Sequence, residues 1–126
     1  MINFARYRIP FYVYAAVIFF ISSLSNPIPE GITIPFFDKI LHVCEYMVFG
    51  FLAARAFKNS PKRRLSENFY ILAIAVSIVY GLSDEIHQFF IAGREFSVFD
   101  IIADGTGATL GAFIYPPLKK LIYGYN

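Results

Sequence analysis

Four long apolar stretches divide the sequence, and they restrict the possible folds more than any other feature. They cover residues 9–24, 37–57, 68–91 and 98–115. A helix needs about 20 residues to cross the roughly 30 Å hydrocarbon core of a bilayer, with a usable range of about 17–25. Each stretch therefore predicts a membrane-spanning helix. The first and the last are short, so we expect Arg8, Lys119 and Lys120 to extend from their ends toward the interface.

The composition also indicates a membrane protein. Hydrophobic residues make up 57% of the chain and charged residues 16%, whereas soluble domains average about 45–50% and 25%. The 126 residues are enough for one domain, which we place over residues 1–126. Because Cys44 is the only cysteine, an intrachain disulfide is excluded.

The segments between the apolar stretches contain signals for turns. Residues 26–35 hold three prolines and a glycine, which exclude a continuous helix. Residues 58–68 predict a charged turn, residues 92–96 a tight turn, and Pro116-Pro117 is expected to close the last span. Short connections favour antiparallel neighbours. The predicted fold is thus an all-α membrane protein, with four transmembrane helices in an antiparallel bundle.

The basic residues predict the orientation of this bundle. Nine of the eleven Lys and Arg residues fall on one side of it, and such an excess marks cytoplasmic loops. The N-terminus and the C-terminus are therefore both predicted to be cytoplasmic. We interpret the first stretch as an uncleaved span, because Ser23, Leu24 and Ser25 match a signal-peptide cleavage site poorly. The nine basic residues are Arg6, Arg8, Arg55, Lys58, Lys62, Arg63, Arg64, Lys119 and Lys120.

The acidic residues segregate to the opposite side. Only Glu67, of nine Asp and Glu residues, is expected on the cytoplasmic side. Acids contribute little to topology, so their segregation needs a separate cause. At about 100° per residue, each of the last three spans presents one polar face. These faces hold Asp38, His42, Glu45 and Tyr46; Ser77, Tyr80, Gly81, Asp84 and Gln88, with Glu85 and His87 on the flanks; and Asp100, Asp104, Gly107 and Gly111.

Three carboxylates from three different spans are expected at one level. With a rise of about 1.5 Å per residue, Glu45, Asp84 and Asp104 lie roughly 9–12 Å below the outer ends of their helices. This common depth predicts one polar pocket that opens outward. Burying an ionisable group costs on the order of 2.5–3.5 kcal/mol, whereas a hydrogen bond between membrane helices returns only about 0.6 kcal/mol. A functional role therefore explains these residues better than helix association does.

The residue types in the pocket indicate their candidate roles. Glu45, Asp84 and His42 are the candidate catalytic residues, because carboxylates and imidazoles are common general acids and bases. Arg94 and Lys39 would hold a phosphate or a carboxylate; alternatively, they neutralise part of the acidic cluster. The complete set of candidate substrate-binding residues is Asp38, Lys39, Tyr46, Tyr80, Glu85, Gln88, Arg94, Asp100 and Asp104.

Several of these residues also have a structural interpretation. Asp38 and Asp100 begin their helices, where a carboxylate favours the positive end of the helix dipole. Tyr46 and Tyr80 would be hydrogen-bonding residues of the core. His87 lies off the shared face, so we interpret it as structural. Gly107 and Gly111 form a small-xxx-small pattern, which lets a neighbouring helix approach closely.

No known catalytic or metal-binding motif is present. The sequence contains no HExxH, GxSxG, P-loop or CxxC pattern and no nucleic-acid-binding module. We accordingly predict no metal ligands and no cofactor. A divalent cation is the alternative, since carboxylates and histidines bind such ions, although no spacing here is typical of a metal site.

Two stretches of the chain resemble the VanZ-like family of small integral membrane proteins. The first runs from Asp38-Lys39 through His42 to Glu45-Tyr46. The second continues in the order of that family, through Tyr80, Asp84-Glu85, Gln88, Gly93-Arg94, Ser97, Asp100, Asp104, Gly107 and Gly111. The ordered set, which covers about two thirds of the chain, carries the resemblance. Two positions depart from the family pattern, where Asn often replaces Asp104 and a proline often replaces Ala92.

The resemblance implies a multi-pass protein of the bacterial cytoplasmic membrane. The namesake of that family is linked to low-level resistance to the glycopeptide antibiotic teicoplanin. The expected partners are membrane lipids and a lipid-linked envelope precursor or a lipoglycopeptide, with no nucleic acid and with an oligomer as an option. The leading hypothesis is a pocket that binds or acts on a cell-envelope lipid or lipid-linked component.

Neither the residues nor the resemblance identifies a reaction. An intramembrane enzyme, a non-catalytic binder that acts as a resistance factor, and a small cation- or proton-coupled transporter therefore all stay open as function classes.

Overall fold

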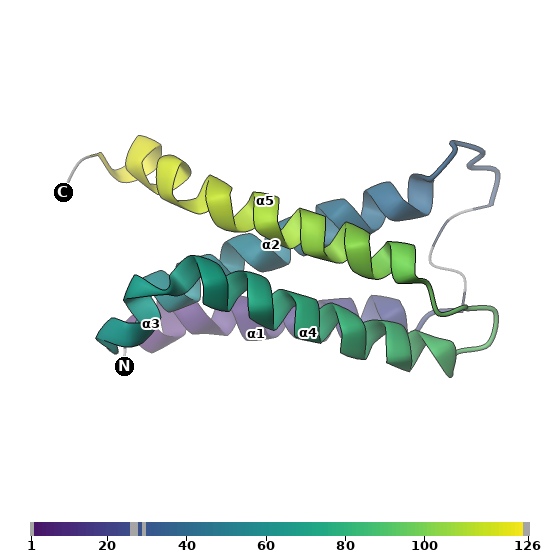
Figure 1. Ribbon diagram of the computed structural model, residues 1–126, viewed down its shortest axis with the longest axis horizontal. Helices are drawn as coiled ribbons and strands as arrows, with labels where there is room; N and C mark the ends of the chain where they lie inside the picture. The colour runs from purple at the N-terminus through teal and green to yellow at the C-terminus, as the bar shows by residue number, and fades with distance from the viewer. Residues whose placement is uncertain (1, 26–27, 29, 125–126) are drawn as a thin grey trace.

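The described part of the chain, residues 2–25, 28 and 30–124 of a computed structural model, is helical and contains no strand. Its helices are α1 (Ile2–Ser22), α2 (Phe37–Lys58), α3 (Arg63–Glu67), α4 (Phe69–Phe89) and α5 (Val98–Tyr123). Figure 1 shows that successive long helices run in opposite directions and that both termini lie at the same end as α3. The predicted all-α class is thus confirmed.

Three helices of this described part are long and apolar enough to cross a membrane, namely α2, α4 and α5. The predicted first span also forms a helix, but α1 is not among the three. It contains Arg6 and Arg8, which make its first turns polar. The multi-pass character therefore rests on α2, α4 and α5, whereas the fourth span and the cytoplasmic placement of the termini stay predictions.

The helix boundaries follow the apolar stretches closely for α2 and α4, but differ for α1 and α5. The first span is predicted over residues 9–24, whereas α1 runs over Ile2–Ser22, because Arg6 and Arg8 lower the hydropathy of the segment without opposing a helix.

The expectation that Pro116-Pro117 closes the last helix is wrong, since α5 continues to Tyr123. A proline removes one backbone donor and crowds the preceding turn, but its φ is close to the helical value. Good helix formers such as Leu118 and Lys119 follow the prolines, and the helix continues without a break.

The connections have the predicted character where the structure describes them. Two of the three prolines in residues 26–35, Pro27 and Pro29, lie outside the described residues, and the described remainder of this segment is not helical before residue 37. The tight turn after α4 contains a hydrogen bond from the Arg94 N–H to the Ile91 carbonyl (3.1 Å) and Gly93 at a φ of 80°. The charged turn contains one feature that the sequence did not predict, the short helix α3.

The closest helix contact is between α2 and α5, and glycines make it possible. A Cβ on Gly107 or Gly111 would overlap the α2 backbone at Val43 or Met47. In the reverse direction, a Cβ on Gly50 would overlap the α5 backbone at Ala108. The two helices therefore touch backbone to backbone, as the small-xxx-small pattern predicts. This contact brings the beginnings of α2 and α5 to the same end of the bundle (Figure 1).

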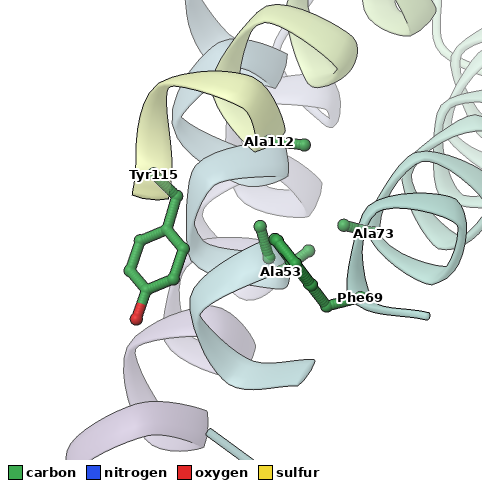
Figure 2. Packing of buried hydrophobic residues seen from close by; sticks show 6 residues of the cluster. Ala53, Phe69, Ala73, Ala112 and Tyr115 are labelled. Carbon is green, nitrogen blue, oxygen red and sulfur yellow. The ribbon is translucent and has the colours of Figure 1, made fainter. Parts of the chain in front are cut away.

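Alanines let α4 join this pair. One buried cluster contains Ala53 and Ala54 of α2, Ala112 and Tyr115 of α5, and Phe69 and Ala73 of α4. Figure 2 shows Phe69 and Ala73 directed toward Ala53. A second cluster adds α1, since Ile18 packs with Tyr46 and Phe49 of α2. Small residues in the core allow close helix packing where apolar lipid supplies no hydrophobic driving force.

The outer faces of the helices are apolar. Exposed large side chains include Ile71 and Val79 of α4, Val48 of α2, and Ile102 and Phe113 of α5. Soluble monomers rarely expose contiguous apolar patches beyond a few hundred Å². These faces are therefore suited to contact with lipid chains.

The glycine contact predicts a position-specific effect on stability. Gly111→Ala should destabilise the protein relative to Gly105→Ala by about 2 kcal/mol or more, because its Cβ overlaps the Met47 carbonyl. Gly105 is the matched control, since its Cβ would meet only Ile78 at 3.7 Å and both changes gain the same helix propensity. Unfolding in mixed detergent measures the difference, and equal stabilities would contradict the backbone contact.

The orientation can be tested by cysteine labelling. In a Cys44→Ala background, we expect a cysteine at Lys62 to react with a membrane-impermeant reagent only from the cytoplasmic side. A cysteine at Glu95, in the exposed turn at the other end, should react only from the outside. The reverse pattern would overturn the orientation predicted from the basic residues.

Candidate functional site

A cavity of about 740 Å³ lies at the end of the bundle opposite the termini. It is bounded by the last turn of α1 and the segment after it, the first three turns of α2, the last two turns of α4, the turn after α4, and the first turn of α5. Most of the candidate residues come together here. Those that line the cavity are Asp38, Lys39, His42, Glu45, Asp84, Gln88, Arg94 and Asp100.

The other candidates lie behind the wall of the cavity rather than in it. Tyr46 is fully buried against Phe49, and the Tyr80 hydroxyl donates to the Ala15 carbonyl at 2.6 Å. Glu85 and Asp104 are both 0% exposed. Tyr80 therefore makes the hydrogen bond expected of it, whereas the buried Tyr46 hydroxyl has no hydrogen-bond partner among the described residues. Glu85 and Asp104 can act on the cavity only through neighbours or through local movement.

His42 connects α2 to α5. Its Nδ1 lies 2.8 Å from Asp104 Oδ1, and its Nε2 lies 3.7 Å from Asp100 Oδ2. Gly81 of α4 makes room for this arrangement, since a Cβ there would lie 2.9 Å from Asp104 Oδ2. The two carboxylates are one helical turn apart on α5, so they approach the two ring nitrogens from the same helix.

The two cations at the cavity differ in their partners. Lys39 Nζ lies 2.6 Å from Asp38 Oδ2 and 2.5 Å from Asp100 Oδ1, so two carboxylates neutralise it. Arg94 instead donates from Nη2 to Gln88 Oε1 at 2.6 Å and from Nη1 to the Leu24 carbonyl at 3.4 Å. Both acceptors of Arg94 are uncharged. Of the two cations, Arg94 is therefore the one that forms no ion pair among the described residues.

A hydrogen-bond chain leads from Arg94 to the cavity wall. Gln88 accepts from Arg94 and donates through Nε2 to Asp84 Oδ2 at 3.0 Å. The amide is thereby oriented by the guanidinium on one side and by the carboxylate on the other. These hydrogen bonds hold Asp84 and Arg94 in the same wall. A carboxylate and a guanidinium cation therefore both line the cavity.

Glu85 is the more buried of the two acids of α4. Its Oε2 accepts the backbone N–H of Ser97 at 3.0 Å, directly before α5. Its Oε1 has no hydrogen-bond partner among the described residues. Ser97 also caps α5, because its Oγ accepts from the Asp100 N–H at 3.3 Å. Glu85 thus holds the beginning of α5 against α4.

His87 lies outside the cavity lining, in agreement with its structural interpretation. Its Nε2 is 3.0 Å from Ser23 Oγ, and its ring stacks on Phe19 with centroids 4.6 Å apart. It therefore attaches the end of α1 to α4.

The sequence did not predict that the end of α1 and the segment after it contribute to the cavity. Ser22 and Ser25 line it, together with the apolar residues Ile21 and Ile28. Ser22 is buried, and its hydroxyl has no hydrogen-bond partner among the described residues. The serines near the end of the first apolar stretch were the sequence feature that could have indicated this contribution. Serines are common at helix ends, however, and do not by themselves predict a binding site.

The fold and the cavity together define a class: a small all-helical, multi-pass membrane protein with a polar pocket at one end of its bundle. The VanZ/LLP1 family profile matches residues 2–122, nearly the whole chain, and the protein therefore belongs to the VanZ/LLP1 family. The resemblance read from the residue pattern is thus confirmed. Neither a curated protein nor a solved structure gives a significant match.

The His42–Asp104 pair predicts a graded response to substitution at position 104. Asp104→Asn should leave the fold intact, because an amide oxygen can still accept from Nδ1–H. Asp104→Ala should cost about 1–3 kcal/mol, since it leaves a buried imidazole nitrogen without a partner. Thermal unfolding in detergent measures both, with Thr106→Ala as an exposed control on the same helix. Equal losses for the Asn and Ala variants would contradict this role.

Proposed function

We propose that the cavity binds the polar head group of a lipid or lipid-linked component of the cell envelope. The observation that carries the proposal is a cavity of about 740 Å³, lined by charged side chains, at the end of helices whose outer faces are apolar. Ligand pockets typically enclose about 300–1,000 Å³. Under the predicted orientation, this cavity opens to the outside of the cytoplasmic membrane.

The charges of the cavity favour a head group with both an anionic and a hydrogen-bonding part. Arg94, whose hydrogen-bond acceptors among the described residues are uncharged, would hold a phosphate through its planar guanidinium. Glu45 and Asp84 lie in the same lining and would accept hydrogen bonds from hydroxyl or amino groups. Lys39 is held by two carboxylates, so in this proposal it orients Asp100 rather than binding the ligand.

The apolar part of the ligand would lie along the rim. Ile21, Ile28, Leu41 and Phe96 line the cavity beside the charged residues. Such a rim suits acyl or prenyl chains that continue into the bilayer.

A binding measurement with a matched control tests the proposal. Native mass spectrometry of the detergent-purified protein should show a bound anionic probe, phosphatidylglycerol or a polyprenyl phosphate, in preference to diacylglycerol. Arg94→Gln should weaken binding by tenfold or more, since it removes the phosphate contact. Arg63→Gln is the control, because this exposed arginine pairs with Glu67 at the opposite end of the bundle. Equal affinity for charged and uncharged lipids would refute the proposal.

The same preparation separates a binder from an enzyme. If the protein transforms its ligand, the mass of the added lipid changes with time, and Glu45→Gln, Asp84→Asn or His42→Ala abolishes the change. If it only binds, the lipid mass stays constant in wild type. A transporter would instead carry a pH- or cation-driven flux in proteoliposomes, which neither of the other two classes predicts.

A further inference from the structure

Three potential metal ligands converge between α2, α4 and α5. His42, Glu85 and Asp100 each offer one ligand atom, and these atoms all lie within 4.8 Å of one another. All three residues are buried, and Glu85 is 0% exposed. They come from three different helices, so no motif in the sequence joins them. We propose that they form a binding site for a divalent transition-metal ion, with zinc as the ion that fits this donor set best.

The strongest observation is the carboxylate of Glu85. Its Oε1 is buried and has no hydrogen-bond partner in the part of the chain that the structure describes. A buried oxygen of this kind costs about 1–3 kcal/mol, and more when it is charged. The free oxygen belongs to one of the three converging residues, and a cation between them would satisfy it.

Each ligand is also oriented by a second contact, which is typical of built metal sites. The Asp104 carboxylate lies 2.8 Å from His42 Nδ1 and, by accepting its proton, leaves the lone pair of Nε2 for a metal. The Ser97 N–H holds Glu85 Oε2 and leaves Oε1. Lys39 holds Asp100 Oδ1 and leaves Oδ2. The three free atoms are one imidazole nitrogen and two carboxylate oxygens.

The distances suit a small ion. His42 Nε2 and Asp100 Oδ2 are 3.7 Å apart, and two ligands on one tetrahedral zinc ion at about 2.0–2.2 Å lie roughly 3.3–3.6 Å from each other. A shift of a few tenths of an ångström would bring this pair to the tetrahedral separation, and the ligand atoms of all three residues lie within 4.8 Å of one another. Mixed histidine and carboxylate ligands favour zinc over calcium or magnesium, which prefer oxygen alone.

The charge balance also favours a cation here. The cavity lining holds the acids Glu30, Asp38, Glu45, Asp84, Glu95 and Asp100 against the cations Lys39 and Arg94. Glu85 and Asp104 lie directly behind this lining and add to the negative charge. A divalent ion between His42, Glu85 and Asp100 would offset two charges where low polarity makes them most costly.

The site adjoins the cavity but does not depend on the proposed lipid binding. His42 and Asp100 line the cavity, whereas Glu85 lies behind it. A zinc ion with three protein ligands keeps one open position, and here that position would face the cavity. The test therefore measures the ion directly, in detergent and without added lipid, so that its failure leaves the lipid proposal untouched.

The first arm measures stoichiometry. Untagged protein is stripped with a chelator, exchanged into chelator-free detergent buffer, and titrated separately with Zn²⁺, Mn²⁺, Mg²⁺ and Ca²⁺. We expect one Zn²⁺ per chain by native mass spectrometry. At a hundredfold excess over Kd, we expect a rise in the unfolding midpoint on the order of 5–10 °C. No stoichiometric ion in folded protein, or a preference for Mg²⁺ or Ca²⁺, would overturn the proposal.

The second arm uses Glu85→Gln, which should have opposite effects on the stability of the metal-free protein and on zinc binding. Glu85→Gln keeps an oxygen for the Ser97 N–H but removes the buried charge, so it should stabilise the metal-free protein and weaken zinc binding at least tenfold. Asp100→Asn should weaken zinc binding to a similar extent. Glu95→Gln is the control, since this exposed acid belongs to the lining but not to the three ligands. The proposal is overturned if Glu85→Gln binds zinc as tightly as wild type does. It is also overturned if Glu95→Gln loses as much zinc affinity as Glu85→Gln.

Discussion

The backbone contact between α2 and α5 is the interaction on which the rest of the structure depends. Gly50, Gly107 and Gly111 remove the side chains that would otherwise hold the two helices apart. Only at this separation can His42 of α2 reach Asp104 of α5 at 2.8 Å and Lys39 reach Asp100 at 2.5 Å. The contact lies next to the polar residues along the same helix faces, so tight packing in one half of the bundle positions the site in the other.

The polar network at the open end of the bundle stabilises its own buried acids but leaves some of its groups without a charged or hydrogen-bonding partner in the part of the chain that the structure describes. Each buried acid has at least one oriented contact, which reduces the cost of placing it among apolar helices. The contacts are uneven, however. Lys39 is neutralised by two carboxylates, whereas Arg94 meets only uncharged acceptors and Glu85 keeps an oxygen without a hydrogen-bond partner among the described residues. The guanidinium of Arg94 is the basis of the proposed anionic head group. The carboxylate oxygen of Glu85 is the basis of the proposed metal ion.

The sequence predicted α2, α4, the beginning of α5 and the polar faces of these three helices well, because these features follow from a period that a single helix determines. It placed the boundary of α2 to within one residue of Phe37–Lys58. It failed at Pro116-Pro117, where the local cost of proline did not stop α5, and it missed α3 and the first seven residues of α1. Within the site, it brought His42, Asp84 and Asp100 to one end of the bundle. It could not tell that Glu85 and Asp104 lie behind the cavity wall, because that depends on how far each helix is rotated against its neighbours.

The sequence by itself therefore determined the class of protein, the antiparallel order of its helices and the set of polar residues that had to share an interior. Hydrophobic length and helical period are local properties, and they need no knowledge of partners. Only the tertiary structure decided which residue pairs with which. The His42–Asp104 pair, the double neutralisation of Lys39 and the convergence of His42, Glu85 and Asp100 each join residues from different helices. Their distances are fixed by the glycine contact and the alanine core, since helix separation and rotation are properties of the packed bundle and not of any one segment.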